Sequence, residues 1–256
     1  MLTIQLLSAL NDNYIYLLHE ATSGETAVID PAEAQPVIDA LEQQGWHLDY
    51  VFNTHHHGDH VGANLALKQR TQCKIVGAAR DQQRIPGIDI TVEEGDIVYL
   101  GNQGLRVMDT PGHTLGHIVY YCETSRALFC GDTLFSLGCG RLFEGSAMQL
   151  WQSLQRLKAL PSDTRVYCAH EYTAANGRFA LSVERDNPEL QQRLSEVSRL
   201  RAANQPTLPS TLELELATNP FLREESLEIR AHLGLSPTAD SSDVFARLRA
   251  LKDHFV

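Results

Sequence analysis

Apolar residues in the first 170 positions come in short runs that are rich in Val, Ile, Leu and Tyr and are separated by turn-forming residues. Runs of this length and composition predict β-strands, and the first of them is expected in the N-terminal stretch MLTIQLLSALNDNYIYLL. The further strands are expected at Tyr14–His19, Thr26–Asp30, Tyr50–Asn53, Lys74–Gly77, Ile97–Leu100, Leu105–Met108, His117–Cys122, Ala127–Cys130 and Arg165–Cys168. Helical periodicity predicts helices at Ala34–Gln44, Gly62–Arg70 and Ala147–Leu160.

The pattern becomes helical after about residue 173. Helices are expected at Asn187–Leu200, Ser226–Leu233 and Ser242–Phe255. The last of them carries an apolar stripe at helical spacing, formed by Val244, Leu248, Leu251 and Phe255. We therefore expect a β-rich domain of residues 1–170 and a helical domain of residues 171–256.

Composition narrows the choice of partners. The 256 residues carry a net charge of −11, which disfavours nucleic acid because phosphate binding needs clustered Lys and Arg. An anionic substrate would need local cations or metal ions to hold it. The five cysteines are scattered without a C-x-x-C pair and are expected to be reduced. Since no long apolar span or signal peptide is recognised, we expect a cytoplasmic protein without a membrane partner.

The segment THHHGDH (54–60) follows the apolar run YVFN and precedes a helical pattern. It brings four metal-type ligands into a single turn: His55, His57, Asp59 and His60. His56 lies between two of them and is expected to point away.

Three more candidate ligands each come just past the end of an apolar run. They are His113 after VMDTPG, Asp132 after LFCG, and His170 after VYCA. If these strands lie side by side in the same direction, their carboxyl ends share one crevice. A lone His in such a place is more often a solvated or core residue, and the repeated context is what favours ligation. His117, four residues after His113, is expected to support the turn.

Five imidazoles and two carboxylates suit zinc, with iron and manganese as alternatives. They are too many for one tetrahedral ion and fit two ions that share a carboxylate, at the separation of ~3.5–4 Å typical of two-metal hydrolases. We expect His55, His57 and His113 to hold one ion and Asp59, His60 and His170 the other, with Asp132 as the bridge. The expected nucleophile is a metal-bound hydroxide assisted by Asp59.

These motifs resemble the metallo-β-lactamase superfamily, whose signature T-H-x-H-x-D-H is followed by later His, Asp and His ligands. Here the motifs read THHHGDH, TPGHTLGH, FCGDTLF and CAHEYT. The resemblance implies an α+β fold, a four-layer αββα sandwich with the metals at one edge, followed by a helical C-terminal domain.

Longer stretches are similar to one family of that superfamily, glyoxalase II, the hydroxyacylglutathione hydrolases. They are CGDTLFSLGCGRLFEG (130–145), AHEYT (169–173), NPFLR (219–223) and RALKDHF (249–255). The resemblance implies hydrolysis of S-(2-hydroxyacyl)glutathione, typically S-D-lactoylglutathione, to glutathione and a 2-hydroxy carboxylate such as D-lactate. This reaction is the second step of methylglyoxal detoxification. It also implies a small-molecule thioester substrate. We expect a monomer, although the sequence does not decide whether the chain dimerises.

The same resemblance assigns the substrate contacts to Arg141, Phe143, Tyr172, Arg249 and Lys252. Arg141 stands where many members have Lys, which keeps the charge. Phe143 stands where some members have Tyr, so that a hydroxyl contact is lost. Without the resemblance, Arg249 and Lys252 would be interpreted as solvated charges on a helix.

Other functions remain open at this point. A persulfide dioxygenase has a related fold and uses one iron ion, and other relatives cleave β-lactams, lactones or phosphodiesters. A thiol hydrolase would use Cys168 or Cys139 with His170. A metal-binding module without turnover would use the same fold but lose an open coordination position or the bridging carboxylate.

Overall fold

The chain folds into two compact units in the computed structural model, which describes residues 1–255. Unit 1 comprises Met1–Thr110 and Leu115–Gly131, and unit 2 comprises Pro111–Thr114 and the chain from Asp132 onward.

Unit 1 contains a six-stranded sheet whose order follows the chain, from β1 to β6. Strands β1 to β3 pair antiparallel, and β3 to β6 pair parallel. The strands are β1 (Thr3–Ala9), β2 (Asn13–His19), β3 (Thr26–Ile29), β4 (Tyr50–Phe52), β5 (Lys74–Ala78) and β6 (Ile90–Val92). Because β3 and β4 run in the same direction, the residues that follow them emerge at one edge of the sheet.

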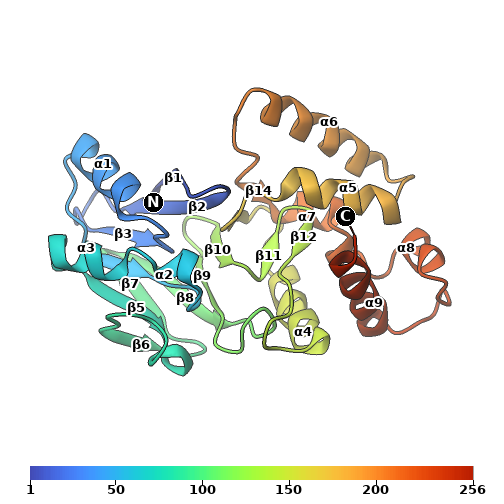
Figure 1. Cartoon of the computed structure of the whole chain (residues 1–256), viewed down its shortest axis with the longest axis horizontal. Helices are drawn as coiled ribbons and strands as arrows, with labels where there is room; N and C mark the ends of the chain where they lie inside the picture. The colour runs from blue at the N-terminus through green and yellow to red at the C-terminus, as the bar shows by residue number, and fades with distance from the viewer. Residues whose placement is uncertain (256) are drawn as a thin grey trace. The chain divides into compact units, whose positions relative to one another are not determined.

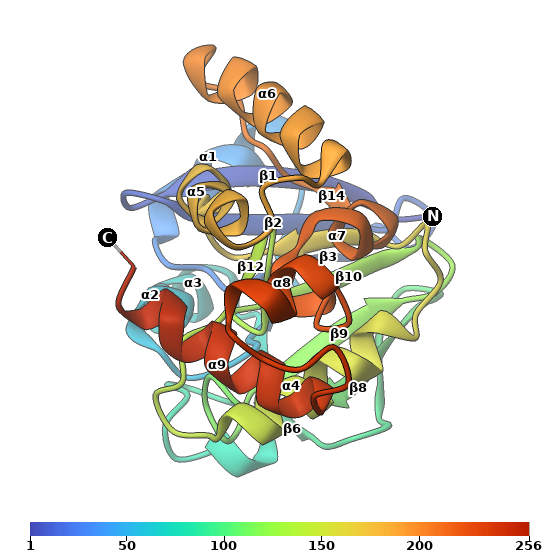
Figure 2. The same cartoon turned by 90° about the vertical axis from the view of Figure 1, so that its right-hand side faces the viewer.

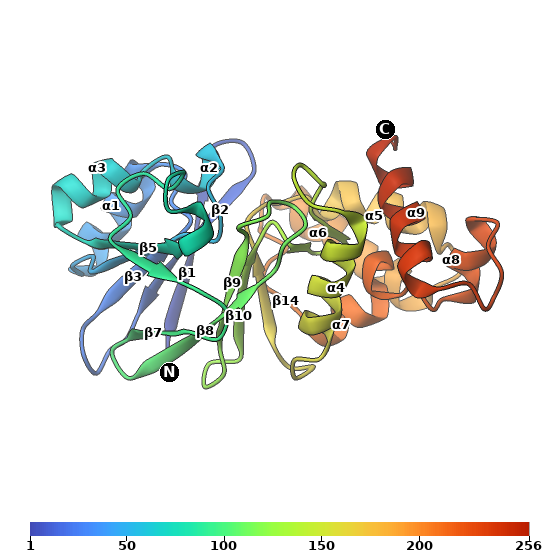
Figure 3. The same cartoon turned by 90° about the horizontal axis from the view of Figure 1, so that it is seen from below.

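Unit 1 also holds an antiparallel meander of β7 (Ile97–Leu100), β8 (Gln103–Asp109), β9 (Ile118–Cys122) and β10 (Ala127–Gly131). The alternating faces of β2 explain how the layers pack. Ile15 and Leu17 join the core shared with the helices, whereas the Tyr16 ring lies 5.9 Å from that of Phe129 in the meander. Unit 1 is thus built as helices on a sheet that packs on a second sheet (Figures 1 and 3).

The helices of unit 1 are α1 (Ala34–Gln44), the single turn α2 (Gly58–Val61) and α3 (Asn64–Thr71), followed by a short 3₁₀ turn η1 (Ala79–Asp81). Helix α1 buries Val37, Ala40 and Leu41 against the first sheet. It ends at Gly45, whose φ of 68° closes the helix in the left-handed conformation that glycine adopts without strain. This packing fixes the sheet edge from which the THHHGDH segment starts.

Unit 2 is mostly helical (Figure 2). Its helices are α4 (Ala147–Lys158), α5 (Thr173–Val183), α6 (Pro188–Ala202), α7 (Leu212–Thr218), the 3₁₀ turn η2 (Pro220–Leu222), α8 (Leu227–His232) and α9 (Ser241–Asp253). Two strand pairs accompany them: β11 (Leu134–Phe135) with β12 (Gly138–Cys139), and β13 (Arg165–Cys168) with β14 (Ser210–Thr211). In the part of the chain that the structure describes, no helix is long and apolar enough to cross a bilayer.

Every strand predicted from the sequence is present within a residue or two of its expected ends, and so are the predicted helices, except that Gly62–Arg70 becomes α3, preceded by α2. The apolar stripe of α9 is corrected by the structure. Val244 and Leu248 are buried, but Leu251 is 37% exposed, and Phe245 and Arg249 are buried in its stead. The buried face of α9 is therefore rotated from the predicted one and includes a charged side chain.

Besides α2, two helices were not predicted, α5 and α7. The α5 sequence TAANGRFALSV has an internal glycine, which disfavours a helix. A Cβ at Gly177 would overlap Cδ2 of Leu194 on α6, so the glycine lets α6 pack closely against α5. The α7 sequence LELELAT alternates with period two, yet Thr211 caps it as a helix by accepting from the Leu214 amide.

Candidate metal centre

The four ligands predicted in unit 1 lie at the carboxyl end of β4, where THHHGDH runs into α2. Asp30 follows the neighbouring parallel strand β3 and is 3% exposed. Its Oδ1 accepts from the Thr54 amide at 2.8 Å, and its Oδ2 accepts from the Thr54 hydroxyl at 2.6 Å. Oδ2 also lies 3.0 Å from Nδ1 of His60. The buried carboxylate of Asp30 thus holds the segment that carries the ligands through Thr54 and His60.

These contacts fix which ring nitrogen of each histidine is available. Asp30 can only accept, so Nδ1 of His60 carries the proton and its Nε2 presents a lone pair. The Thr54 hydroxyl gives its proton to Asp30 and accepts from Nδ1 of His55 at 3.1 Å. Nε2 of His55 is therefore the ring nitrogen that carries the lone pair. Asp30 orients both rings, one directly and one through Thr54.

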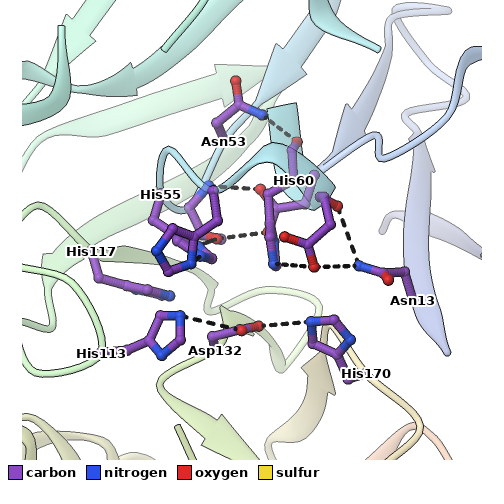
Figure 4. A network of polar contacts seen from close by, with 12 residues as sticks. Asn13, Asn53, His55, His60, His113, His117, Asp132 and His170 are labelled. Carbon is purple, nitrogen blue, oxygen red and sulfur yellow. Dashed lines mark hydrogen bonds and ion pairs between the residues drawn. The ribbon is translucent and has the colours of Figure 1, made fainter. Parts of the chain in front are cut away.

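The unit 1 donors lie in two neighbouring pairs. Nε2 of His55 is 3.0 Å from Nδ1 of His57. Nε2 of His60 is 3.6 Å from Oδ2 of Asp59, which accepts from Nδ2 of Asn13 at 3.0 Å (Figure 4). His55, His60 and Asp30 also offer ligand atoms that lie within 4.8 Å of one another. His55 thus lies beside His57, and Asp59 beside His60, as the predicted grouping requires.

Of the three predicted ligands of unit 2, two are imidazoles that face the carboxylate of the third, Asp132. Nε2 of His113 lies 3.4 Å from Oδ2 of Asp132, and Nε2 of His170 lies 3.4 Å from Oδ1 (Figure 4). Each imidazole therefore faces a different oxygen. Nδ1 of His113 is 2.8 Å from the carbonyl oxygen of Arg141, which can only accept, so Nδ1 carries a proton. When the ring is neutral, its lone pair is therefore on Nε2, the atom that faces the carboxylate.

This arrangement fits metal ions and is poor as a set of hydrogen bonds. A lone pair that faces a carboxylate oxygen is repelled unless a cation lies between them. Charge-assisted hydrogen bonds measure about 2.7–2.9 Å, shorter than the separations of 3.4 and 3.6 Å. Two ligands at about 2.0–2.1 Å from a tetrahedral zinc ion are roughly 3.4 Å apart. The donor set of oxygen and imidazole nitrogen is the set that divalent metals bind.

The two histidines excluded from the ligand set have other partners. Nδ1 of His56 lies 3.0 Å from Oδ2 of the fully buried Asp81, away from the ligand pairs, as expected. Nδ1 of His117 lies 3.1 Å from Oγ1 of Thr110, and its ring stacks on that of His55 with centroids 4.7 Å apart. His117 thus supports both its own turn and a ligand ring.

Unit 2 contains a cavity of about 390 Å³ beside these ligands. All five residues predicted to contact substrate line it, together with His113 and Asp132: Arg141, Phe143, Tyr172, Arg249 and Lys252. The Tyr172 ring stacks on His170 with centroids 4.7 Å apart. Burial, assisted by the cations Arg249, Arg178 and Arg141, lowers the pKa of Lys252. A positive cluster therefore exists at this cavity in a chain of net charge −11.

The two cationic residues of α9 differ in their surroundings. Arg249 is 4% exposed, and its guanidinium contacts backbone carbonyls and Asp253. Lys252 is partly exposed, with Nζ 5.5 Å from the ring centroids of Phe179 and Phe255. Lys252 is thus the more accessible cation.

The thiol alternative loses support in the structure. Cys168 and Cys139 are buried, and burial raises the pKa of both thiols. Since the thiolate is the nucleophile, this environment opposes nucleophilic catalysis.

Sequence reasoning missed three residues that orient the site: Asp30, Thr54 and Asn13. Asp30 carried the same signal as Asp132, a carboxylate at the end of an apolar run, but it was included in the predicted strand. Asn13 gave no signal because its contact with Asp59 is made across 46 positions of the sequence.

Comparison with known proteins agrees with this geometry. The family model described as "Metallo-beta-lactamase superfamily" matches residues 10–170, and the one described as "Hydroxyacylglutathione hydrolase C-terminus" matches residues 171–255. A hydroxyacylglutathione hydrolase of Methylococcus capsulatus is 57% identical over 100% of this chain and 99% of the relative. One of Rhodospirillum rubrum is 53% identical over 99% of each chain.

Solved structures show the same fold. The B3 metallo-β-lactamase BLEG-1 matches with a TM-score of 0.67 at 21% identity, covering 86% of this chain and 100% of that one. ETHE1 from Myxococcus xanthus matches with a TM-score of 0.61 at 29% identity. The match covers 85% of this chain and 96% of that one.

Fold and site therefore place the chain in the metallo-β-lactamase superfamily, and the predicted α+β class with a helical C-terminal region is confirmed. The His and Asp donors make the site one for divalent metal ions. Within the superfamily, the chain belongs to the hydroxyacylglutathione hydrolase family, glyoxalase II, so the predicted enzyme family is also confirmed.

Proposed function

We propose that this chain hydrolyses S-(2-hydroxyacyl)glutathione, typified by S-D-lactoylglutathione, to glutathione and a 2-hydroxy carboxylate. The observation that carries the proposal is the unit 2 cavity, which is lined both by the ligand candidates His113 and Asp132 and by the cations Arg141, Arg249 and Lys252. A thioester whose thiol portion bears carboxylates needs metal-type donors and cations at one cavity. Membership of the family supports the same reaction.

The proposed metal site holds two divalent ions, zinc first among the candidates. His55, His57 and His113 would hold one ion, Asp59, His60 and His170 the other, and Asp132 both. When bound, the ions supply Lewis acidity that polarises a carbonyl group and makes water nucleophilic near neutral pH. Which metal is present in the cell, the cytoplasmic location and the monomeric state stay predictions.

The chain's own residues orient the reactants. Asn13 holds the Asp59 carboxylate, which in turn would accept a hydrogen bond from the attacking water. The stacked ring of Tyr172 and the exposed ring of Phe143 would bracket the thiol portion of the substrate, and Lys252 would pair with one of its carboxylates. The leaving thiolate has a parent pKa of ~8.5, so no strong general acid is needed.

In this proposal the two predicted domains, which divide at residue 170, have different roles. Residues 1–170 contain all seven proposed metal ligands. Residues 171–256 contribute Tyr172, Arg249 and Lys252, and we propose that they form the substrate-binding domain.

A comparison of three substrates tests the proposal. The wild-type protein should hydrolyse S-D-lactoylglutathione far faster than a β-lactam or a phosphodiester, and chelator treatment should abolish the activity. Faster cleavage of either alternative, or activity unharmed by metal removal, would contradict it. The persulfide dioxygenase alternative predicts instead one iron ion per chain and oxygen consumption with a persulfide substrate.

A further inference from the structure

The hairpin of β11 and β12 links two parts of the proposed metal site. It begins two residues after Asp132 and ends two residues before Arg141, whose carbonyl oxygen faces Nδ1 of His113. A displacement of this hairpin would therefore move the proposed bridging carboxylate and reorient one ligand ring.

The hairpin is held by buried polar side chains from the helical C-terminal region. Nδ2 of Asn219 donates to the carbonyl oxygens of Phe135 and Gly138, at 3.0 Å each. Oε2 of Glu215 accepts from the Leu137 amide at 2.8 Å. Both side chains are fully buried, so these contacts replace hydration that the backbone groups would otherwise lack.

Arg249 holds the end of the hairpin. Its Nη1 donates to the carbonyl oxygen of Cys139 at 3.0 Å and to that of Gly140 at 3.4 Å, and its Nη2 donates to Asp253 at 3.0 Å. The side chain is 4% exposed. Burial of a guanidinium is costly unless hydrogen bonds and charge compensate it. Here the compensation comes in part from the backbone that leads to the ligands.

Gly140, whose carbonyl oxygen accepts from Arg249, packs directly against the ligand residues Asp132 and His113. A Cβ built on Gly140 would overlap the carbonyl oxygen of Asp132 and would lie 3.2 Å from Cβ of His113. The amides of Phe143 and Glu144 donate to the carbonyl oxygen of His113, at 3.2 and 3.3 Å. Backbone contacts thus join the segment after β12 tightly to His113 and Asp132.

We propose that Arg249 is a positioning residue for the metal ligands His113 and Asp132, in addition to lining the substrate cavity. It acts through the carbonyl oxygens of Cys139 and Gly140. The inference rests on the proposed function, because it assumes that these two residues bind metal. It differs from a simple clamp on a substrate carboxylate, which would not alter metal affinity in the absence of substrate.

The test measures metal affinity without substrate, by competition between the metal-free protein and a chromogenic chelator. Arg249→Met removes the donors and keeps much of the apolar volume. Loss of a group hydrogen-bonded directly to a metal ligand usually costs about 10- to 100-fold, and because Arg249 acts one contact further out, we expect metal affinity to fall by about 10-fold. Arg249→Lys keeps the cation but not the paired donors, and it should lie between wild type and Arg249→Met.

Two control variants separate this effect from others. Arg230 on α8 is also buried, and it donates to the carbonyl oxygens of Glu224 and Pro237, so Arg230→Met should lower Tm with wild-type metal affinity. Lys252→Met should raise KM and also leave metal affinity at the wild-type value.

The outcomes distinguish the two proposals. Wild-type metal affinity in folded Arg249→Met would overturn the positioning role and leave the proposed function standing. If Arg249→Met does not fold, Arg249→Lys decides, and wild-type affinity there has the same meaning. A wild-type protein that binds no divalent ions would contradict the proposed function itself.

Discussion

Oδ2 of Asp30 lies 3.0 Å from Nδ1 of His60, deep behind the segment that carries four of the proposed ligands. The same oxygen accepts from the Thr54 hydroxyl, which faces Nδ1 of His55. One buried carboxylate therefore sets the tautomers of two histidines assigned to different ions. This relationship makes Asp30 a sensitive place to test the metal site without removing a ligand.

Replacing Asp30 with Asn should weaken the binding of both proposed ions. The amide cannot accept at all three contacts, so the ring orientations and the basicity of the ligands change, and metal affinity should fall by about 10- to 100-fold. Metal titration of the purified variant measures this. Asp89→Asn is the control, because Asp89 pairs with Lys68 and is not among the proposed ligands or their partners. An Asp30→Asn protein with wild-type affinity would contradict the assigned role.

Two glycines close to ligands should respond in opposite ways to alanine. Gly58 lies between His57 and Asp59 in sequence, yet a Cβ there would meet nothing within 4 Å, so Gly58→Ala should keep its metal content and Tm. In Gly140→Ala the new methyl group would overlap the carbonyl oxygen of Asp132, so this variant should have a lower metal content and a lower Tm. Elemental analysis and thermal unfolding measure the pair. A greater loss in Gly58→Ala would refute the geometry.

Removal of the Asp59 carboxylate should be far more damaging than removal of its partner. Asp59→Ala deletes a proposed ligand, so kcat should collapse by about 10³-fold or more if catalysis needs both ions. Asn13→Ala keeps the ligand but removes the hydrogen bonds from Nδ2 of Asn13 to Oδ2 of Asp59 at 3.0 Å and to its carbonyl oxygen at 3.2 Å, and kcat should fall by about 10-fold. Steady-state kinetics compare them. Equal turnover in wild type and Asp59→Ala would count against the two-ion scheme.

Glu184 gives a pH test of stability that is independent of the metal site. Burial opposes its ionised form, but hydrogen bonds from Arg223, Ser226 and Asn187 outweigh burial and lower its pKa. A carboxyl group whose pKa falls on folding stabilises the protein above the unfolded pKa of 4.5, and this contribution disappears as pH falls through the folded pKa.

Glu184→Gln should therefore lower the free energy of unfolding at pH 7 by ~1–3 kcal/mol, since charged hydrogen bonds to Arg223 are lost. The difference from wild type should shrink as the pH is lowered below about 4.5. Urea unfolding at several pH values measures it. A difference that is constant with pH would show that the charge of Glu184 does not contribute.

The sequence predicted much of the fold because strand runs and helix stops are local signals. It failed where a distant contact decides the structure. Glu215 lies in LELELAT, whose period suggests a strand rather than a helix, and its partner is the Leu137 amide 78 positions away. Leu251 fits the apolar stripe of α9, but packing of α9 buries Arg249 instead. Neither the helical state of LELELAT nor the burial of Arg249 can be predicted from the neighbouring residues in the sequence.

The candidate ligands were predictable because metal binding needs rare side chains at strand ends, and THHHGDH concentrates them. Their supports were less predictable. Asp30 stood at a strand end without a motif, and the carbonyl oxygen of Arg141 that orients His113 carries no side-chain signature at all. Backbone groups position ligands through geometry, which only the folded chain reveals.

The central claim is that the seven proposed ligands hold a pair of divalent ions. The most direct measurement is the number of ions bound per chain when metal-free wild-type protein is titrated to saturation, with thioester hydrolysis followed in the same sample. The account predicts two ions per chain, with full activity reached only as the second is bound. Saturation at one ion with full activity would contradict it.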